Sequence, residues 1–318
     1  MNQESDKPKY IIVLGTTYSG SGAVYDYLAG RGDLHDPLDG EEYQLPQVPN
    51  GLMALEAAAG KAFHPAAADY ALFQFEEVVQ RLARPRTKWS YGKNYDRKIP
   101  GFRDVISQFV DEVSTAHLPM WMDWHRLMQS RVQYSLERLL NRMGLHHSPP
   151  ETRLLVSREE LVAAAQSLND RLFQKGINNC PVLLNQAGSG WNPLESTKYF
   201  SNCRVVVVTR DPRDQYIDIK KHKKATYVKG FIDWYNEMQN RLEGICDSRL
   251  LHIRFEDFVN SHDQSVRQIC DHLKLPLGVE STYQVELSRK NVGLYRSSLD
   301  KREADIIKGA FCKDAKDS

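Results

Sequence analysis

The run YIIVL at residues 10–14, followed by GTTYSGSGA at residues 15–23, decides the fold of this chain. The first five residues are apolar, which predicts a short buried strand. The stretch from Ala23 to Gly30 has helical spacing, so a helix is expected directly after the glycine-rich turn. A strand, a glycine-rich loop and a helix in this order are typical of a nucleotide site, because the helix N-terminus favours anions.

Three later segments also predict buried strands, because β-branched and apolar residues dominate them. They are residues 181–185, 204–209 and 250–254. Helical patterns are expected at residues 69–82, 124–143, 158–173, 231–245 and 264–273. Since strands alternate with helices, we expect an α/β fold, a doubly wound parallel sheet flanked by helices. Residues 83–101 predict an irregular surface segment, and the Gly and Pro residues of 144–150 predict the end of one helix and the start of another.

The bulk composition is that of one soluble globular domain. The chain has 318 residues and a formal net charge of +1, so it offers no broad positive field and no nucleic acid partner is expected. No apolar run approaches membrane-spanning length, and no stable membrane insertion is expected. Five separated cysteines without a C-x-x-C pair favour reduced thiols. With no room for a signal peptide before residue 10, these features predict a cytoplasmic protein.

The loop after the first strand favours a phosphate or sulfate ligand. Residues 15–23 offer successive backbone N–H groups, serine hydroxyls and a helix N-terminus. A nucleoside-triphosphate P-loop would need a Lys after Gly20, where this chain has Ser21, so a kinase or ATPase is disfavoured. The alternative is a glycine-rich turn without a ligand.

Arg210 stands directly after the strand 204–209 and before the sequence Asp-Pro-Arg-Asp. The planar guanidinium group can donate two parallel hydrogen bonds to a phosphate. Without further information, a structural ion pair with Asp211 or Asp214 is an equally good interpretation.

Five motifs, in order along the chain, together resemble the sulfotransferases that use 3′-phosphoadenosine 5′-phosphosulfate. Residues 18–22 resemble the 5′-phosphosulfate loop, and residues 210–214 resemble the 3′-phosphate motif. Residues 254–258, 273–276 and 288–296 are similar to three later elements of the family, the last of which closes over the nucleotide. The resemblance implies one sulfotransferase domain, residues 1–318, of P-loop-like fold. Residues 52–179 have no clear match and are expected to form a helical insertion that contributes the acceptor site.

The resemblance also implies the site residues and the reaction. The donor would be bound by Thr17, Tyr18, Ser19, Gly20, Ser21, Gly22, Ala23, Arg210, Arg289, Lys290, Asn291 and Gly293. The sequence Gly40-Glu-Glu-Tyr43 resembles an element of tyrosylprotein sulfotransferases and, more closely, of bacterial enzymes that sulfate surface carbohydrates. It implies Glu42, and after it Glu41, as general base for a hydroxyl of a glycan or other hydroxylated acceptor. An ordinary solvated carboxylate is the alternative for both.

Two positions depart from the family pattern. Tyr18 stands where the phosphosulfate loop usually has Lys or Arg, and Lys88, Arg103 or Lys290 are candidates to replace that charge. Asp218 stands where a Ser is common near the 3′-phosphate, and Lys220, Lys221 or Arg289 are candidates to contact the phosphate instead. These departures keep open a second hypothesis, a relative that binds nucleotide without catalysing transfer.

Other residue clusters favour structural roles. His35, His64 and His125 are rival bases, and each is expected to be structural. His146 and His147 have no further ligands at metal-binding spacing, so no metal is expected. The basic run 220–224 predicts a solvated helix face, with attraction of an anionic nucleotide or glycan as the alternative. Trp121 and Trp124 are interpreted as packing residues rather than a sugar platform.

Overall fold

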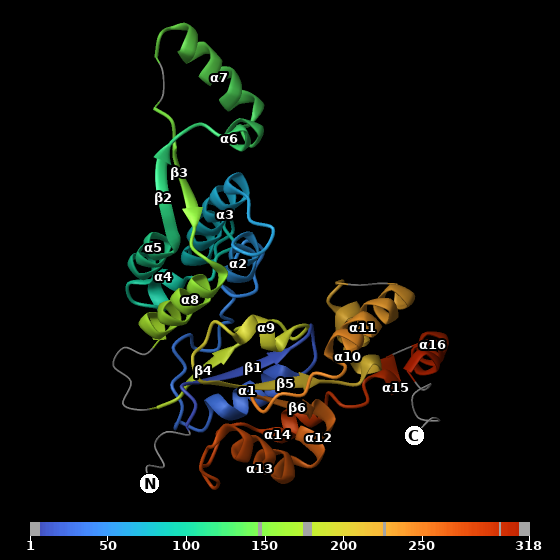
Figure 1. Ribbon diagram of the computed structural model, residues 1–318. Helices are drawn as coiled ribbons and strands as arrows, with labels where there is room; N and C mark the ends of the chain where they lie inside the picture. The colour runs from blue at the N-terminus through green and yellow to red at the C-terminus, as the bar shows by residue number, and fades with distance from the viewer. Residues whose placement is uncertain (1–6, 146–147, 174–179, 225–226, 299, 312–318) are drawn as a thin grey trace. The chain divides into compact units, whose positions relative to one another are not determined.

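The computed structural model describes residues 7–145, 148–173, 180–224, 227–298 and 300–311 (Figure 1). The chain forms two compact units. Unit 1 comprises residues 1–44 and 176–318, and unit 2 comprises residues 45–175. The expected organisation, one domain with an insertion at 52–179, stays a prediction. His146, His147 and Cys312 lie outside the described residues.

The four predicted strands form one parallel sheet in unit 1. They are β1 (Tyr10–Gly15), β4 (Val182–Asn185), β5 (Cys203–Thr209) and β6 (Leu250–Arg254). The order across the sheet is β4-β1-β5-β6, and all neighbours are parallel. The first strand is therefore central, with its successors on both sides. In such sheets ligands bind outside the carboxyl ends of the strands where the order reverses, which is here between β1 and β5.

Both faces of this sheet are covered, as the continuous apolar strands predict. On one face α1 (Ser21–Ala29), α12 (Phe255–Asn260) and α13 (His262–Leu273) pack against Ile11, Val13, Val206 and Val208. On the other face the ring of Tyr10 contacts Phe200 edge-on, just after α9 (Pro193–Thr197). Residues 10–14 are completely buried as a result.

The remaining helices of unit 1 form a second apolar cluster beside the sheet. It contains α10 (Pro212–Lys221), α11 (Val228–Leu242) and α16 (Lys301–Phe311). Their contact is made by the buried side chains Tyr216, Phe231, Tyr235, Met238 and Ile307. Two short helices, α14 (Val285–Arg289) and α15 (Tyr295–Ser298), lie in the segment between α13 and α16.

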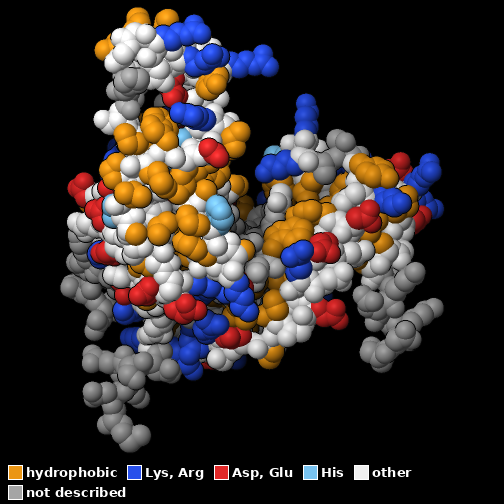
Figure 2. Space-filling view, turned by 45° about the horizontal axis from the view of Figure 1, so that its top comes forward, with side chains coloured by type: hydrophobic (Ala, Val, Ile, Leu, Met, Phe, Trp, Pro, Cys, Tyr) orange, Lys and Arg blue, Asp and Glu red, His pale blue; other side chains and the backbone are white. Residues whose placement is uncertain are grey.

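Unit 2 is mostly helical but also contains a two-stranded antiparallel sheet (Figure 1). The helices are α2 (Leu52–Ala58), α3 (Pro65–Ala83), α4 (Tyr95–Lys98), α5 (Phe102–Val113), α6 (Asp123–Leu127), α7 (Arg131–Arg142) and α8 (Arg158–Phe173). The strands are β2 (Ser114–Pro119) and β3 (Glu151–Leu155). Its core includes Phe75, Phe109, Leu161 and Leu168. Figure 2 shows hydrophobic and charged side chains interspersed on one face of the molecule.

Two expectations for unit 2 are wrong. The predicted helix 124–143 is two helices, because the Ser130 side chain accepts a bond from the Gln133 N–H and starts α7 afresh. The stretch 144–150 was expected to open a helix, but Pro149 and Pro150 are followed by strand β3, because proline disfavours helical backbone before it and residues 151–155 pair with β2. The segment 83–101, expected to be irregular and at the surface, is so only in part. Residues 84–94 are irregular, with Trp89 almost fully exposed, but residues 95–98 form helix α4, and Tyr95 is buried because its ring packs against Phe102.

None of the helices in the described part of the chain is long and apolar enough to cross a membrane.

Candidate functional site

The loop between β1 and α1 follows a tight path that only particular residues permit. Gly20 has φ +84°, and a side chain there would clash with the buried ring of Phe255. Tyr18 also has a positive φ of 59°. The Ser19 N–H donates to the Thr16 carbonyl at 2.9 Å, which closes the turn. The first turn of α1 then presents backbone N–H groups without partners inside the helix, as an anion site requires.

Gln186 holds the loop from the neighbouring strand. Its side-chain oxygen accepts the Gly15 N–H at 3.2 Å, and its Nε2 donates to the Ser21 hydroxyl at 2.9 Å. Because the Ser21 oxygen accepts this bond, the hydroxyl hydrogen of Ser21 points away from Gln186 and can be donated to an anion. Ser19 is buried too, and its hydroxyl has no hydrogen-bond partner among the described residues.

Gln215 ties the loop to helix α10. Its buried Nε2 donates to the Thr17 carbonyl at 2.6 Å and to the Thr16 hydroxyl at 3.1 Å. The sequence indicated Gln215 only as part of a family-like stretch. Gln215 stands five residues after Arg210, one turn into a helix that starts at the edge of the sheet. This position is the sequence signal for its contact with the loop.

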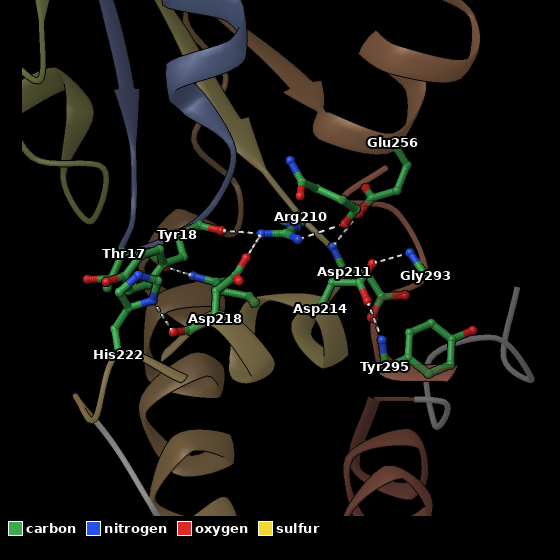
Figure 3. A network of polar contacts seen from close by, with 12 residues as sticks. Thr17, Tyr18, Arg210, Asp211, Asp214, Asp218, His222, Glu256, Gly293 and Tyr295 are labelled. Atoms are coloured by element: carbon green, nitrogen blue, oxygen red, sulfur yellow. Dashed lines mark hydrogen bonds and ion pairs between the residues drawn. The ribbon is translucent and has the colours of Figure 1, made fainter. Parts of the chain in front are cut away.

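Arg210 is the centre of a buried polar network (Figure 3). Its Nη1 donates to the Tyr18 carbonyl at 3.1 Å and to Asp218 Oδ2 at 2.6 Å, and its Nη2 donates to the Asn291 carbonyl at 2.8 Å. The Phe255 ring lies 5.2 Å below the guanidinium carbon. The side chain is only 4% exposed, and its Nε has no hydrogen-bond partner among the described residues. The buried Nε–H of Arg210 thus points to no acceptor in the described part of the chain.

Asp214 fixes the segment that follows α14. Its carboxylate accepts the Gly293 N–H at 2.6 Å and the Tyr295 N–H at 2.9 Å. Burial raises the pKa of Asp214 above its ordinary value, and these two N–H groups oppose part of that rise. The ring of Tyr295 in turn stacks under Arg213 at 3.8 Å. The sequence indicated Asp214 only as part of the motif 210–214, whereas in the structure Asp214 holds the backbone of residues 293 and 295.

The third motif closes the network. Glu256 accepts the Asp211 N–H at 2.8 Å, and Asp211 binds Arg213 through both carboxylate oxygens. Burial favours a higher pKa for Asp211, but the bonds from Arg213 hold it below its ordinary value. We call residues 210, 211, 213, 214, 218 and 256, with the backbone of residues 18, 291, 293 and 295, the Arg210 network.

Four of the five motifs therefore meet at the carboxyl end of β1 and β5. The fifth, residues 273–276, lies at the end of α13 instead. Leu273 is fully buried, Lys274 ends α13 in the left-handed conformation, and the Pro276 carbonyl accepts a bond from the buried Arg31 at 2.9 Å. This motif supports the fold.

Several predicted donor-binding residues are placed away from the network. Ala23 packs into the core, and Gly22 is exposed with open space around its Cα. Arg289 donates to the Val259 carbonyl at 3.1 and 2.9 Å and pairs with Glu286. Lys290 is exposed. These positions leave the donor-binding roles of Arg289 and Lys290 as predictions.

Glu42 lies at the same edge of the sheet. The segment that carries it runs beside β4, with the Tyr43 N–H donating to the Asn185 carbonyl at 2.9 Å. Glu42 Oε2 accepts a bond from Gln44 Nε2 at 2.8 Å. Glu41 is half-buried next to it. Both carboxylates thus belong to unit 1, next to the strand that also carries Gln186.

The ring of Tyr18 is covered by basic residues from the end of α10. His222 stacks on it with 4.8 Å between ring centres, and Lys224 Nζ lies 5.0 Å from its centre. The run 220–224 was expected to be a solvated face, and Lys220 does pair with Glu303 at the surface. Of the candidates to replace the missing loop charge, Lys88 and Arg103 lie in unit 2.

A pocket of about 380 Å³ opens beside the loop in unit 1. Its walls come from the loop, α10 and α11 and are mainly apolar and aromatic. They are formed by Thr17, Ile219, Lys224, Tyr227, Gly230, Phe231 and Trp234.

Unit 2 has a pocket of its own, of about 370 Å³. Phe73, Trp121 and Trp124 give it aromatic walls, and Asp69 lies buried at its base. Asp69 accepts a bond from Trp124 Nε1 at 3.1 Å and lies 3.5 Å from His125 Nε2. His125 is therefore held by a structural carboxylate, and Trp121 and Trp124 line a cavity rather than a closed core.

The other two rival bases have structural contacts. The His35 N–H donates to the Pro181 carbonyl beside β4, and His64 caps α3. Within the described residues, no group of three or more His, Cys, Asp or Glu side chains is arranged to hold a metal ion.

Residues 191–278 match the model of the sulfotransferase family. No curated protein matches the chain by sequence. Among solved structures, the sulfotransferase domain of the Synechococcus PCC 7002 olefin synthase aligns at 12% identity over 97% of this chain and 98% of its own, with a TM-score of 0.43. The sulfotransferase domain of the curacin biosynthetic pathway aligns at 13% identity over 96% and 98%, with a TM-score of 0.41. Sulfotransferase STF1 of Mycobacterium tuberculosis H37Rv aligns at 13% identity over 96% and 77%, with a TM-score of 0.40.

Proposed function

We propose that this chain, in which residues 191–278 carry the sulfotransferase family pattern, transfers a sulfuryl group from 3′-phosphoadenosine 5′-phosphosulfate to a hydroxyl of a carbohydrate. The observation that carries this proposal is the meeting of four motifs around Arg210 at the point where the strand order reverses. Separate segments of the sequence supply a loop for one anionic group and a buried arginine for another.

The residues present fit such a donor at two places. The loop offers the first turn of α1 and the Ser21 hydroxyl, whose oxygen is already bonded to Gln186. Arg210 offers its buried Nε–H, which has no partner among the described residues. An unmet buried donor costs about 1–3 kcal/mol, so an anion that accepts this bond would be favoured. When bound, the donor supplies the sulfuryl group and a phosphate leaving group.

The chain's own residues then position the acceptor and move one proton. A bond forms between the acceptor oxygen and sulfur while the bond from sulfur to the phosphate oxygen breaks. Glu42 takes the proton of the acceptor hydroxyl. Lys224, beside Tyr18, supplies positive charge at the loop where the family pattern has Lys or Arg.

The acceptor has two suitable surfaces. The pocket beside Thr17 is lined by Tyr227, Phe231 and Trp234, whose flat apolar rings suit the faces of a sugar ring. The pocket of unit 2 combines aromatic walls with polar side chains, including Gln129 and Arg153, in the manner of a small-molecule site. The acceptor role expected for residues 52–179 stays a prediction.

The purified chain should release adenosine 3′,5′-bisphosphate from the donor in the presence of a suitable member of a glycan panel. Glu42→Gln should lower the transfer rate by about 10²- to 10⁴-fold and leave bisphosphate affinity unchanged, because a base acts on the acceptor. Glu41→Gln tests the second candidate base, and a loss of transfer in this variant alone would assign the base to Glu41. Full activity of Glu42→Gln would contradict the role of Glu42, and absence of nucleotide binding would contradict the proposed function.

A second candidate function is nucleotide binding without transfer. The specific observation that favours it is the ion pair of Asp218 with Arg210, together with Tyr18 in the loop. It predicts tight binding of the bisphosphate in calorimetry with no turnover on any acceptor of the panel.

A further inference from the structure

The carboxylate of Asp218 binds Arg210 as an external anion would. Its Oδ2 lies 2.6 Å from Arg210 Nη1, a distance typical of a charge-assisted bond. The carbonyls of Tyr18 and Asn291 accept two further donors of the same guanidinium group. The positive charge of Arg210 is thus already neutralised by a carboxylate inside the protein, while its buried Nε has no hydrogen-bond partner among the described residues.

The other charged groups of the Arg210 network are mostly acidic. Arg213 is paired with Asp211, Asp214 accepts two backbone N–H groups, and Glu256 accepts a third and lies 3.9 Å from Arg254 Nη2. Figure 3 shows Arg210 among Asp211, Asp214, Asp218 and Glu256. A phosphate dianion brought to Arg210 would meet the Asp218 carboxylate on the same guanidinium group, and like charges at such a distance repel each other.

The two partners of this pair differ in their freedom to move. The Arg210 side chain is 4% exposed and is held by two backbone carbonyls from separate segments. The Asp218 side chain is 20% exposed and lies on the second turn of α10. A rotation about its side-chain bonds can therefore take the carboxylate into solvent, whereas Arg210 would stay in place.

We propose that Asp218 is a specificity-determining residue that competes with the 3′-phosphate of the nucleotide for Arg210. The proposal rests on the proposed function, which places that phosphate at Arg210. In the free protein Asp218 neutralises the buried arginine. Binding of a 3′-phosphorylated nucleotide breaks this ion pair, and the cost of breaking it lowers the preference for nucleotides with a 3′-phosphate over those without one.

The test is calorimetry with adenosine 3′,5′-bisphosphate and adenosine 5′-monophosphate on the wild type, Asp218→Asn and Asp218→Ser. Both variants remove the competing charge. A bond to a charged group corresponds to about a ten- to hundredfold change in affinity, so both should bind the bisphosphate tighter by about that factor. Affinity for the monophosphate should stay unchanged, because it has no group at Arg210. Asp247→Asn removes a similar Asp–Arg pair, with Arg249, and should alter neither affinity.

The outcomes separate this proposal from the proposed function. If the wild type binds the bisphosphate and the Asp218 variants bind it no tighter, the competition is wrong and the proposed function stands. An equal gain for both nucleotides would also overturn it, because that result indicates a general effect of charge. If no protein of the set binds either nucleotide, the proposed function itself fails.

A second measurement needs no variant. In a crystal structure of the wild type with the bisphosphate, Asp218 should have left Arg210, and a phosphate oxygen should lie within hydrogen-bond distance of the guanidinium group. Persistence of the 2.6 Å pair with nucleotide bound would overturn the proposal.

Discussion

The Arg210 network and helix α7 reverse the usual rule of which residues are buried. In the network, Arg210 and Asp214 are at most 6% exposed. In α7 no residue is buried, although the helix has a clear apolar stripe. The exposed members of that stripe are Val132, Leu136, Leu139 and Met143. Charged groups are buried where several segments supply partners, and apolar groups stay exposed where no segment packs against them.

The same difference predicts where substitutions matter. In the Arg210 network the side chains contact residues from distant parts of the sequence. Small substitutions there should therefore lower stability or ligand affinity. On α7 the side chains lack such constraints, and larger changes should be tolerated.

The largest effect is expected at Gly20. Gly20→Ala combines an unfavourable positive φ with a clash against Phe255, and we expect a loss of about 2–4 kcal/mol in the free energy of unfolding. Urea denaturation measures this loss. Gly22→Ala, two residues later with open space around it, is the control and should change stability by less than about 1 kcal/mol. Equal effects at both positions would show that the loop is not confined as described.

A smaller effect, specific to one ligand, is expected at Arg210. Arg210→Ala should weaken adenosine 3′,5′-bisphosphate by about ten- to a hundredfold in calorimetry, because bonds to charged groups are worth roughly 1.5–3 kcal/mol. Adenosine 5′-monophosphate should bind the variant and the wild type almost equally. Arg249→Ala, which removes a surface arginine paired with Asp247, is the control. An equal loss for both nucleotides would mean that Arg210 only holds the loop and residue 291 together.

The smallest effect is expected on α7. Leu139→Gln replaces a side chain that is 53% exposed, so stability should change by less than about 0.5 kcal/mol. Leu168→Ala, in the buried core of the same unit, should cost about 2–5 kcal/mol. Thermal unfolding of both variants measures the contrast. A large loss for Leu139→Gln would show that the stripe is covered in solution.

The sequence alone predicted the elements of unit 1 well. Residues 10–14 and 204–209 are continuous apolar runs, and such runs form buried parallel strands for reasons that are local to each segment. The glycine-rich loop and the arginine that follows β5 were found in the same way. Four of the five motifs that the sequence indicated lie together around Arg210, and their binding of a donor stays a prediction.

The contacts among those segments were decided only by the tertiary structure. No local pattern says that Asp214 binds the backbone of residues 293 and 295, or that Gln215 reaches back to Thr17. Strand β3 was missed for the same reason, since it exists through its pairing with β2. The helix boundary at Ser130 is different, because a serine followed three residues later by Gln133 forms a capping box, which is a local signal. Backbone preferences and apolar periodicity act within a few residues, so they determine elements. Hydrogen bonds and ion pairs such as that of Arg210 with Asp218 join residues that only the packed sheet and its helices bring within reach.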